Sequence, residues 1–162
     1  MVGAYNNNLI TAFQVGKAGD AFTERYIEIR SASVVVATGY KTFDAERIEN
    51  YGYGRLPNVI TSHELEEMLA DGSIKRPSDG KEIESIAFVQ CAGSRDENYL
   101  RHCSGVCCLA SLKQARYVRE QYPDAQIFIF YIDIRAPGRL EDFYAEVQKD
   151  EKLELIKGKA AK

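Results

Sequence analysis

The chain has 162 residues, of which 45% are hydrophobic and 28% charged, and its formal net charge is −3 at pH 7. This balance is typical of a globular domain and excludes a wholly disordered chain. A general nucleic-acid-binding protein would show a basic excess, so nucleic acid is not an expected partner. The longest apolar run, "IFIFYI" at 127–132, is far shorter than the ~20 residues that span a bilayer. We therefore expect no direct membrane span.

The first forty residues are rich in β-forming segments. The runs "LITAFQV" (9–15) and "ERYIEIRSASVVVA" (24–37) carry β-branched and aromatic residues on either side of the glycine-containing "GKAGD" (16–20). This pattern predicts a β-hairpin or meander whose last apolar strand stops at the glycine of "ATGY" (37–40). The N-terminal "MVGAYNNNL" lacks the basic and apolar parts of a secretory signal, so we expect a cytoplasmic protein with reduced thiols.

Residues 41–84 are expected to form mostly a connector, because turn-forming residues are frequent there. One short helix is predicted inside this segment, since Thr61 and Glu64 make a capping-box pattern. The apolar residues that would share one face of this helix are Leu65, Met68 and Leu69.

From residue 85 onward the sequence alternates between strand and helix patterns. It predicts strand 85–90, helix 104–122, strand 126–132, helix 139–150 and strand 153–158. Nearly continuous apolar strands alternating with helices are typical of a parallel α/β sheet, so we expect a Rossmann-like βαβαβ unit. A parallel sheet of three strands leaves apolar surface open, which predicts either a segment of a longer protein or a protein that depends on a partner. The expected segments are the β-rich end of a first domain at 1–40, the connector at 41–84 and an incomplete Rossmann-like domain at 85–162.

All four cysteines of the chain fall within eighteen residues. They are Cys91, Cys103, Cys107 and Cys108. Cys91 follows the first strand of the expected βαβαβ unit, and the other three cysteines lie at the start of the next helix. Their sulfurs can therefore converge at the carboxyl edge of the sheet, which is where such folds place ligands. Cys103 and Cys107 share one helix face, whereas Cys108 lies about 100° further round. Binding by all four therefore requires an irregular start to the helix.

Four converging thiols suggest three alternatives. A [4Fe–4S] cluster takes four cysteines in varied spacings, and a helix N-terminus would stabilise its negative charge, with Arg95, Arg101 and His102 as compensating cations. Structural zinc also takes four cysteines, although usually in paired knuckles, and buried cysteines are often inert. Spacing alone leaves the cluster, zinc and structural thiols open. A dithiol oxidoreductase is disfavoured, because the chain has no C-x-x-C.

A dinucleotide site is not expected in this unit. Phosphate loops need glycines where the backbone approaches the pyrophosphate, but the loop after strand 85–90 reads "CAGSRD", with Gly93 alone. The segment "GYGRLP" (52–57) has Pro57 at its sixth position and no strand before it, so it is not a nucleotide loop. We therefore expect NADH and NADPH to bind more weakly than ~1 mM.

Six segments of the chain carry a resemblance to a known family. They are "ATGY" (37–40), "YGYGRLPNVITSHELE" (51–66), "RPSDGKE" (76–82), "FVQCAGSRDE" (88–97), "YLRHCSGVCC" (99–108) and "FYIDIRAPGRLEDFY" (130–144). From about residue 30 onward the chain resembles the flavoprotein A subunit of heterodisulfide reductases. It is also similar to the related A subunit of the quinone-interacting membrane-bound oxidoreductase, and the two cysteine segments look closer to this second protein.

The resemblance implies the fold of a thioredoxin-reductase-like flavoprotein. It implies that the four cysteines ligate a [4Fe–4S] cluster, and that Thr38, Gly39 and Tyr40 lie beside FAD in the intact protein. The glycine-rich FAD-binding turn of the family lies outside this segment, so we do not expect this chain to retain FAD. The implied function is an electron relay between the flavin and a partner's redox centre, as part of a larger oxidoreductase complex.

The implied partners are the other subunits of a heterodisulfide-reductase-like or quinone-interacting complex of sulfur metabolism. Such a protein would be cytoplasmic and at most peripheral to the inner membrane through these subunits. The alternative from another class is a zinc- or thiol-stabilised interaction module without catalytic function. Iron and acid-labile sulfide content separates these two hypotheses.

Overall fold

The structure is a computed structural model that describes residues 3–5, 9–12, 27–30 and 32–160. The chain divides into two compact units, residues 1–42 and 43–162, which are described separately. The turn expected at 16–20, and the expected strand residues at 13–15 and 24–26, lie outside the described residues.

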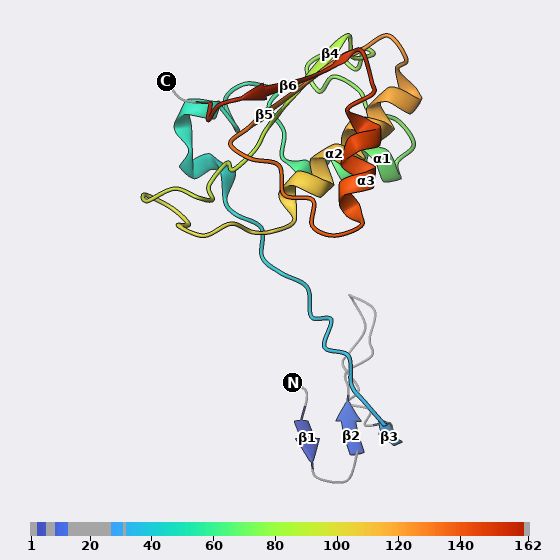
Figure 1. Cartoon of the computed structure of the whole chain (residues 1–162). Coiled ribbons are helices and arrows are strands. Elements are labelled where there is room, and N and C mark those ends of the chain that lie inside the picture. Colours follow the sequence, from blue (N-terminus) through green and yellow to red (C-terminus); the bar gives the residue numbers. More distant parts are fainter. Residues whose placement is uncertain (1–2, 6–8, 13–26, 31, 161–162) are drawn as a thin grey trace. The chain divides into compact units, whose positions relative to one another are not determined.

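The first unit contains a small antiparallel sheet. Its strands are β1 (Gly3–Tyr5), β2 (Leu9–Ala12) and β3 (Ile27–Arg30), paired in the order β1-β2-β3 (Figure 1). The expected continuation of the last strand through residue 37 is wrong, because residues 32–42 belong to no strand. Val35 and Val36 are exposed there. A valine-rich segment forms a strand only when a neighbouring strand satisfies its backbone groups, so the side-chain pattern alone overestimated β-structure.

The second unit is built on a parallel sheet, which confirms the expected α/β class. Its strands β4 (Ser85–Val89), β5 (Gln126–Tyr131) and β6 (Leu153–Lys157) pair in chain order. Two connecting helices, α2 (Cys107–Gln121) and α3 (Leu140–Val147), alternate with the strands. Figure 1 shows both on the same side of the sheet, together with α1 (Ser62–Ala70). Each parallel connection therefore crosses back over one face, as in a Rossmann-like unit.

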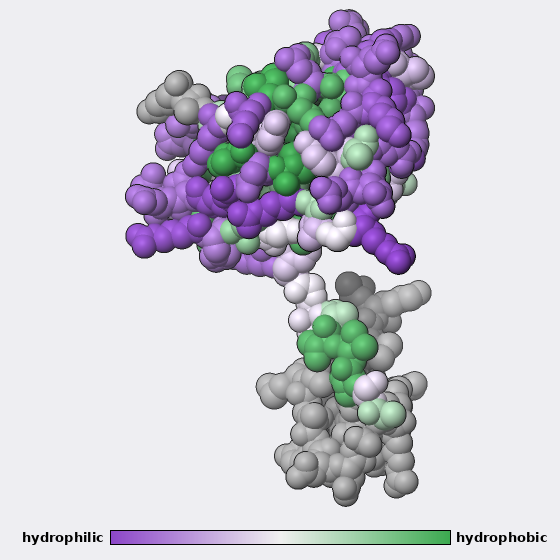
Figure 2. Space-filling model, in the orientation of Figure 1, coloured by the Kyte–Doolittle hydropathy of each residue, from purple (hydrophilic) through white to green (hydrophobic). Residues whose placement is uncertain are grey.

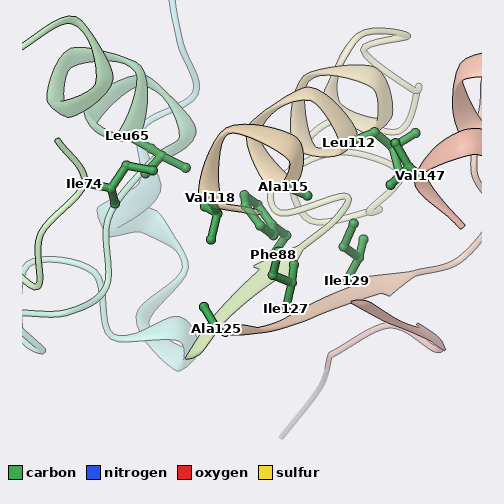
Figure 3. Close-up of a cluster of buried hydrophobic side chains, with 10 residues drawn as sticks. All are labelled: Leu65, Ile74, Phe88, Leu112, Ala115, Val118, Ala125, Ile127, Ile129 and Val147. Carbon is green, nitrogen blue, oxygen red and sulfur yellow. The ribbon is translucent and has the colours of Figure 1, made fainter. Parts of the chain in front are cut away.

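The hydrophobic core lies between the sheet and these helices. In Figure 3, Phe88, Ile127 and Ile129 from the strands lie below the α2 residues Leu112 and Val118. The two isoleucines of β5 are fully buried, because the central strand has a neighbour on each side and a helix above it. The complete cluster is Leu65, Ile74, Phe88, Leu112, Ala115, Val118, Ala125, Ile127, Ile129 and Val147.

The other face of the sheet is only partly covered. Strand residues alternate between the two faces, so Phe128, Phe130 and Ile156 point away from the core, and all three are half-buried. Figure 2 shows an apolar area over β5 and β6, surrounded by hydrophilic residues. Parallel sheets are usually covered on both faces, so this is a side on which the unit offers apolar surface for further packing.

Helix α1 begins at the predicted capping box. The Thr61 hydroxyl accepts the Glu64 backbone N–H at 3.2 Å, and the Glu64 carboxylate accepts the Thr61 N–H at 2.6 Å. Partial burial would raise the pKa of Glu64, but the hydrogen bonds from Thr61 outweigh it, so the pKa is lowered. The helix turns Leu65 into the core, with Met68 and Leu69 packed against it. This local prediction is confirmed.

No helix in the described ranges is long and apolar enough to cross a membrane. The longest, α2, has 15 residues and alternates buried positions such as Leu112 with exposed ones such as Lys113. Its pattern is that of an amphipathic helix covering a sheet.

A buried amide connects α1 to α2. The Gln114 side chain is fully buried, and its Nε2 donates to the Ser62 carbonyl at 3.1 Å and to a Glu66 carboxylate oxygen at 2.7 Å. Its Oε1 accepts the Ser62 hydroxyl at 3.1 Å. Because both ends of the amide have partners, the group fixes the position of α1 without leaving an unsatisfied polar atom.

We expect the substitution Gln114→Met to lower the free energy of unfolding by about 1–3 kcal/mol, because the hydrogen bonds between the Gln114 amide and Ser62 and Glu66 would be lost. Urea unfolding followed by circular dichroism measures this loss. The control is Glu120→Gln, on the exposed side of the same helix, which should stay within about 0.5 kcal/mol of the wild type. Equal midpoints for both variants would show that the amide does not hold α1 in place.

Candidate metal centre

The structure places all four cysteines at or near the carboxyl edge of the parallel sheet. Cys91 follows β4 by two residues and is buried, and Cys103 lies half-buried in the loop that leads to α2. Cys107 and Cys108 are the first two residues of α2, the first half-buried and the second buried. All four are free thiols. Cys91, Cys107 and Cys108 therefore lie where the sequence predicts relative to the strand and the helix. The prediction that Cys103 and Cys107 share one helix face is wrong, because α2 begins at Cys107 and Cys103 lies in the loop before it.

The loop after β4 turns sharply through three left-handed residues. Cys91 has φ 59°, Gly93 φ 78° and Arg95 φ 53°. A non-glycine residue in this region costs roughly 1–2 kcal/mol, so surrounding contacts must hold Cys91 and Arg95 in place. Alternating left-handed residues also turn successive backbone N–H groups to one side, which makes a concavity suited to an anion.

Backbone hydrogen bonds fold this loop back on itself. The Leu100 N–H donates to the Gly93 carbonyl at 3.2 Å, and the Arg95 N–H donates to the His102 carbonyl at 3.2 Å. The return segment therefore runs beside the outgoing one and delivers the chain to Cys103 and then to α2. The loop is thus a defined structure that brings its two ends to the same edge of the sheet.

The sulfur of Cys107 is the centre of the contacts at this edge. The neighbouring Cys108 thiol first, and then the Ser104 hydroxyl and the Cys91 backbone N–H, favour its charged form more than partial burial disfavours it, and they lower the pKa of Cys107 to about 5. The pKa of Cys108 is raised, by the neighbouring Cys107 sulfur first and then by burial. A lowered thiol pKa favours the thiolate, which is the form that binds metals.

The thiol of Cys108 also lies 3.7 Å from the Asp133 carbonyl oxygen, in the loop after β5. The carboxylate of Asp133 forms an ion pair with Arg95 and lies 3.4 Å from Arg135. Of the cations expected around the cysteines, Arg95 is thus already paired with an acid, whereas Arg101 and His102 are exposed. The two loops at the carboxyl edge are joined through Asp133.

The described residues do not show the cysteines grouped as a set of metal ligands, since no three histidine, cysteine or acidic side chains among them are placed to hold one ion. The Cys103 sulfur accepts the Gly105 N–H at 3.3 Å. Gly105 is exposed and has φ 77°, and a Cβ atom there would meet no heavy atom within 4 Å.

The donor set fits a thiolate-bound group in kind. Soft thiolates select zinc or iron–sulfur clusters, and the pKa of one of the four thiols is lowered. Helix α2 begins after Val106 without a side-chain cap, so its first N–H groups are available to an anion. The Gly105 N–H donates to the Cys103 sulfur. These features suit a cluster and are compatible with zinc.

The other predicted site residues lie in the first unit. Thr38, Gly39 and Tyr40 belong to no helix or strand and are exposed. Gly39 has φ 74°, a conformation that side chains rarely adopt, so a glycine is favoured there. Their assignment as flavin neighbours stays a prediction.

The sequence analysis missed an aromatic cluster that supports the cysteine loop. The rings of Phe43 and Tyr99 meet edge to face at 5.6 Å, and the Arg47 guanidinium lies 5.5–5.6 Å from both ring centres. A Cβ atom on Gly93 would lie only 2.5 Å from the Phe43 ring. The glycine in "CAGSRD" was the available signal, since it marks a close approach as well as a turn.

The end of the described chain is also attached to this region. The Tyr51 hydroxyl donates to the Ala160 carbonyl at 2.9 Å, and Lys159 forms an ion pair with Asp96 of the cysteine loop. The pKa of Asp96 is lowered, chiefly by the hydrogen bond from Lys159. The cysteine loop therefore contacts residues from both ends of the second unit.

We expect Gly93→Ala to destabilise the fold more than Gly105→Ala. Both glycines have left-handed φ values, so both alanines cost about 1 kcal/mol in backbone conformation. Only the alanine at position 93 would also collide with Phe43, which adds about 1–3 kcal/mol. Urea unfolding of the two variants measures the difference. Equal losses would mean that the ring does not press on the loop.

A parallel α/β unit with a cysteine loop in place of a glycine-rich phosphate loop defines a candidate metal–thiolate domain. No family model matches the chain. Curated relatives do match. One is the A subunit of the ferredoxin:CoB-CoM heterodisulfide reductase of Methanosarcina mazei, which is 46% identical to this chain over 142 residues. The match covers 83% of this chain and 18% of the relative. The chain belongs to the family of heterodisulfide reductase A subunits.

Two further relatives show the same relationship. An iron-sulfur A subunit of the CoB–CoM heterodisulfide reductase of Methanopyrus kandleri is 41% identical over 145 residues. The A subunit of the H(2):CoB-CoM heterodisulfide,ferredoxin reductase of Methanothermobacter marburgensis is 41% identical over 142 residues. Each match covers 83% of this chain and 22% of the relative. The chain therefore spans about one fifth of the length of the curated relatives that it matches.

Proposed function

We propose that this chain is the electron-transfer segment of a larger oxidoreductase subunit. Its four cysteines hold a [4Fe–4S] cluster that relays electrons between a flavin and the redox centre of a partner subunit. The observation that carries the proposal is the position of the four cysteines at or near the carboxyl edge of the sheet, after β4 and at the start of α2. The Methanopyrus kandleri relative is named an iron-sulfur subunit, which supports the choice of iron over zinc.

Each part of the chain has a defined role in this proposal. Cys91, Cys103, Cys107 and Cys108 are the ligands. When bound, the cluster would supply one-electron transfer. The Gly105 N–H donates to the Cys103 sulfur and so stabilises negative charge there. The start of α2 adds its dipole in the same direction.

The flavin side of the proposal rests on the segment that precedes the second unit. Thr38, Gly39 and Tyr40 are the proposed neighbours of FAD in the full-length protein, within a thioredoxin-reductase-like fold. Only two residues separate Tyr40 from Phe43, which packs against the cysteine loop at Gly93. A short covalent connection thus leads from the proposed flavin contact to the cluster domain.

The proposed domain organisation follows the same roles. Residues 1–40 end the flavin-domain segment, 41–84 connect, and 85–162 form the cluster-bearing domain. The partners would be the other subunits of a heterodisulfide-reductase-like complex or of a related quinone-interacting one, in sulfur metabolism. The location would be cytoplasmic, or peripheral to the inner membrane through those subunits.

Anaerobic reconstitution with iron and sulfide should load about four iron and four sulfide per chain and give a broad visible absorbance. We expect Cys91→Ser to remove most of the iron, because a buried ligand is lost. Asn98→Ala, in the exposed part of the same loop, is the matched control and should load like the wild type. Zinc bound in preference to iron, with no sulfide, would instead establish the zinc-stabilised interaction module.

The purified chain should not retain FAD through gel filtration. FAD affinity in such folds depends on a pyrophosphate bound at a glycine-rich turn before a helix, and no such turn occurs in the sequence. Flavin absorbance of the eluted protein measures retention. Stoichiometric FAD in the peak would show that the segment "VVVATGY" or its surroundings bind the cofactor far better than we propose.

A further inference from the structure

One buried amide in the second unit has no hydrogen-bond partner. The Gln90 residue is only 4% exposed, and its Nε2 makes no hydrogen bond. Among buried side-chain nitrogen and oxygen atoms of the described residues, only one other atom shares this condition, a terminal nitrogen of Arg119. Burying an amide without an acceptor is unfavourable, so an orphaned donor in a native site points to a group that it meets there.

The Arg119 atom has an ordinary explanation. Its guanidinium has five donors in total, and it already donates to the Asp150 carboxylate and to the Tyr122 and Pro123 carbonyls. The terminal nitrogen without a partner is therefore one unused donor of a guanidinium group whose other nitrogens make hydrogen bonds near the end of α2. Gln90 differs, because no hydrogen bond satisfies its buried amide nitrogen.

The position of Gln90 places its side chain on the face of the sheet that α2 covers. Its backbone N–H donates to the Phe130 carbonyl at 2.9 Å, so the strand ladder continues one residue beyond β4. Side chains alternate along a strand, which puts Gln90 on the same face as Phe88, which packs in the core with α2. The buried residue in the first turn of α2 is Cys108.

The chain brings two sets of cysteines to this end of β4. Cys91 is the residue after Gln90, and Cys107 and Cys108 begin the helix that covers this face of the sheet. Thiolates of a cluster held by these cysteines would therefore lie near a buried amide donor that has no acceptor of its own. Sulfur is a weak acceptor when protonated but a good one when it carries negative charge.

We propose that the Gln90 side chain donates an N–H···S hydrogen bond to the thiolate-bound cluster and raises its reduction potential. This inference rests on the proposed function. On reduction the group gains one electron, and no bond forms or breaks in the protein. The amide dipole stabilises the additional negative charge, as hydrogen bonds to cluster sulfurs do in general. Gln90 is thus a positioning residue for electron transfer and is not a ligand.

The test compares Gln90→Met with Gln114→Met. Both replace a buried glutamine by an apolar side chain of similar volume, but Gln114 has partners at both ends of its amide. Reconstituted protein is titrated anaerobically with a reductant, and the electron paramagnetic resonance signal of the reduced state gives the midpoint potential. The same variants without metal are unfolded in urea.

For Gln90→Met we expect wild-type iron content and a more negative potential. A tenfold weaker relative stabilisation of the reduced state corresponds to about 59 mV for one electron. Without metal this variant should be as stable as the wild type or more stable, because an orphaned donor is removed. Gln114→Met should show the reverse, with a lower urea midpoint and an unchanged potential. A hyperfine coupling from side-chain ¹⁵N of labelled glutamine should be present in wild type and absent in Gln90→Met.

Three results would overturn the inference. An unchanged potential in fully loaded Gln90→Met would show that the amide does not act on the cluster. A urea midpoint that falls as far as in Gln114→Met would show that Gln90 is structural. Failure of the wild type to take up iron and sulfide would reject the proposed function itself, which the iron assay distinguishes from the first two results.

Discussion

The parallel pairing of β4 with β5 is the constraint on which the candidate site depends. The register pairs Val89 with Phe130, so both strands end at one edge and their following loops start side by side. The cysteine loop after β4 and the loop carrying Asp133 after β5 therefore meet. The contacts of Asp133 with Cys108 and with Arg95 follow from this pairing. Helix α2 returns over the same edge and adds Cys107.

The two buried glutamines show how differently polar groups are used within one unit. Gln114 lies over the middle of the core and is fully satisfied, so it stabilises the packing of α1 on α2. Gln90 lies at the ligand edge and leaves a donor unused. An unsatisfied buried donor costs stability in the empty protein, and binding sites are where native proteins retain such groups.

Local rules predicted most of the second unit. The Thr61–Glu64 capping box and the apolar strands are patterns of near neighbours, and the structure has them close to the predicted residues. The valine-rich segment before residue 38 was misassigned, because a strand also needs a partner that sequence does not show. The left-handed Cys91 and the approach of Phe43 to Gly93 depend on tertiary packing. The periodicity of the sequence could therefore not predict these two features.

The cysteine loop also explains how one sheet edge serves different ligands. In nucleotide-binding units the edge offers a glycine-rich turn and a helix N-terminus to a pyrophosphate. Here the helix N-terminus is kept without a side-chain cap, while left-handed residues at Cys91 and Gly93 supply the tight turn. Both arrangements place backbone N–H groups around negative charge. The lowered pKa of Cys107 is consistent with negative charge on sulfur at this edge, so the cysteine loop and a phosphate loop share the same electrostatic preference for an anion.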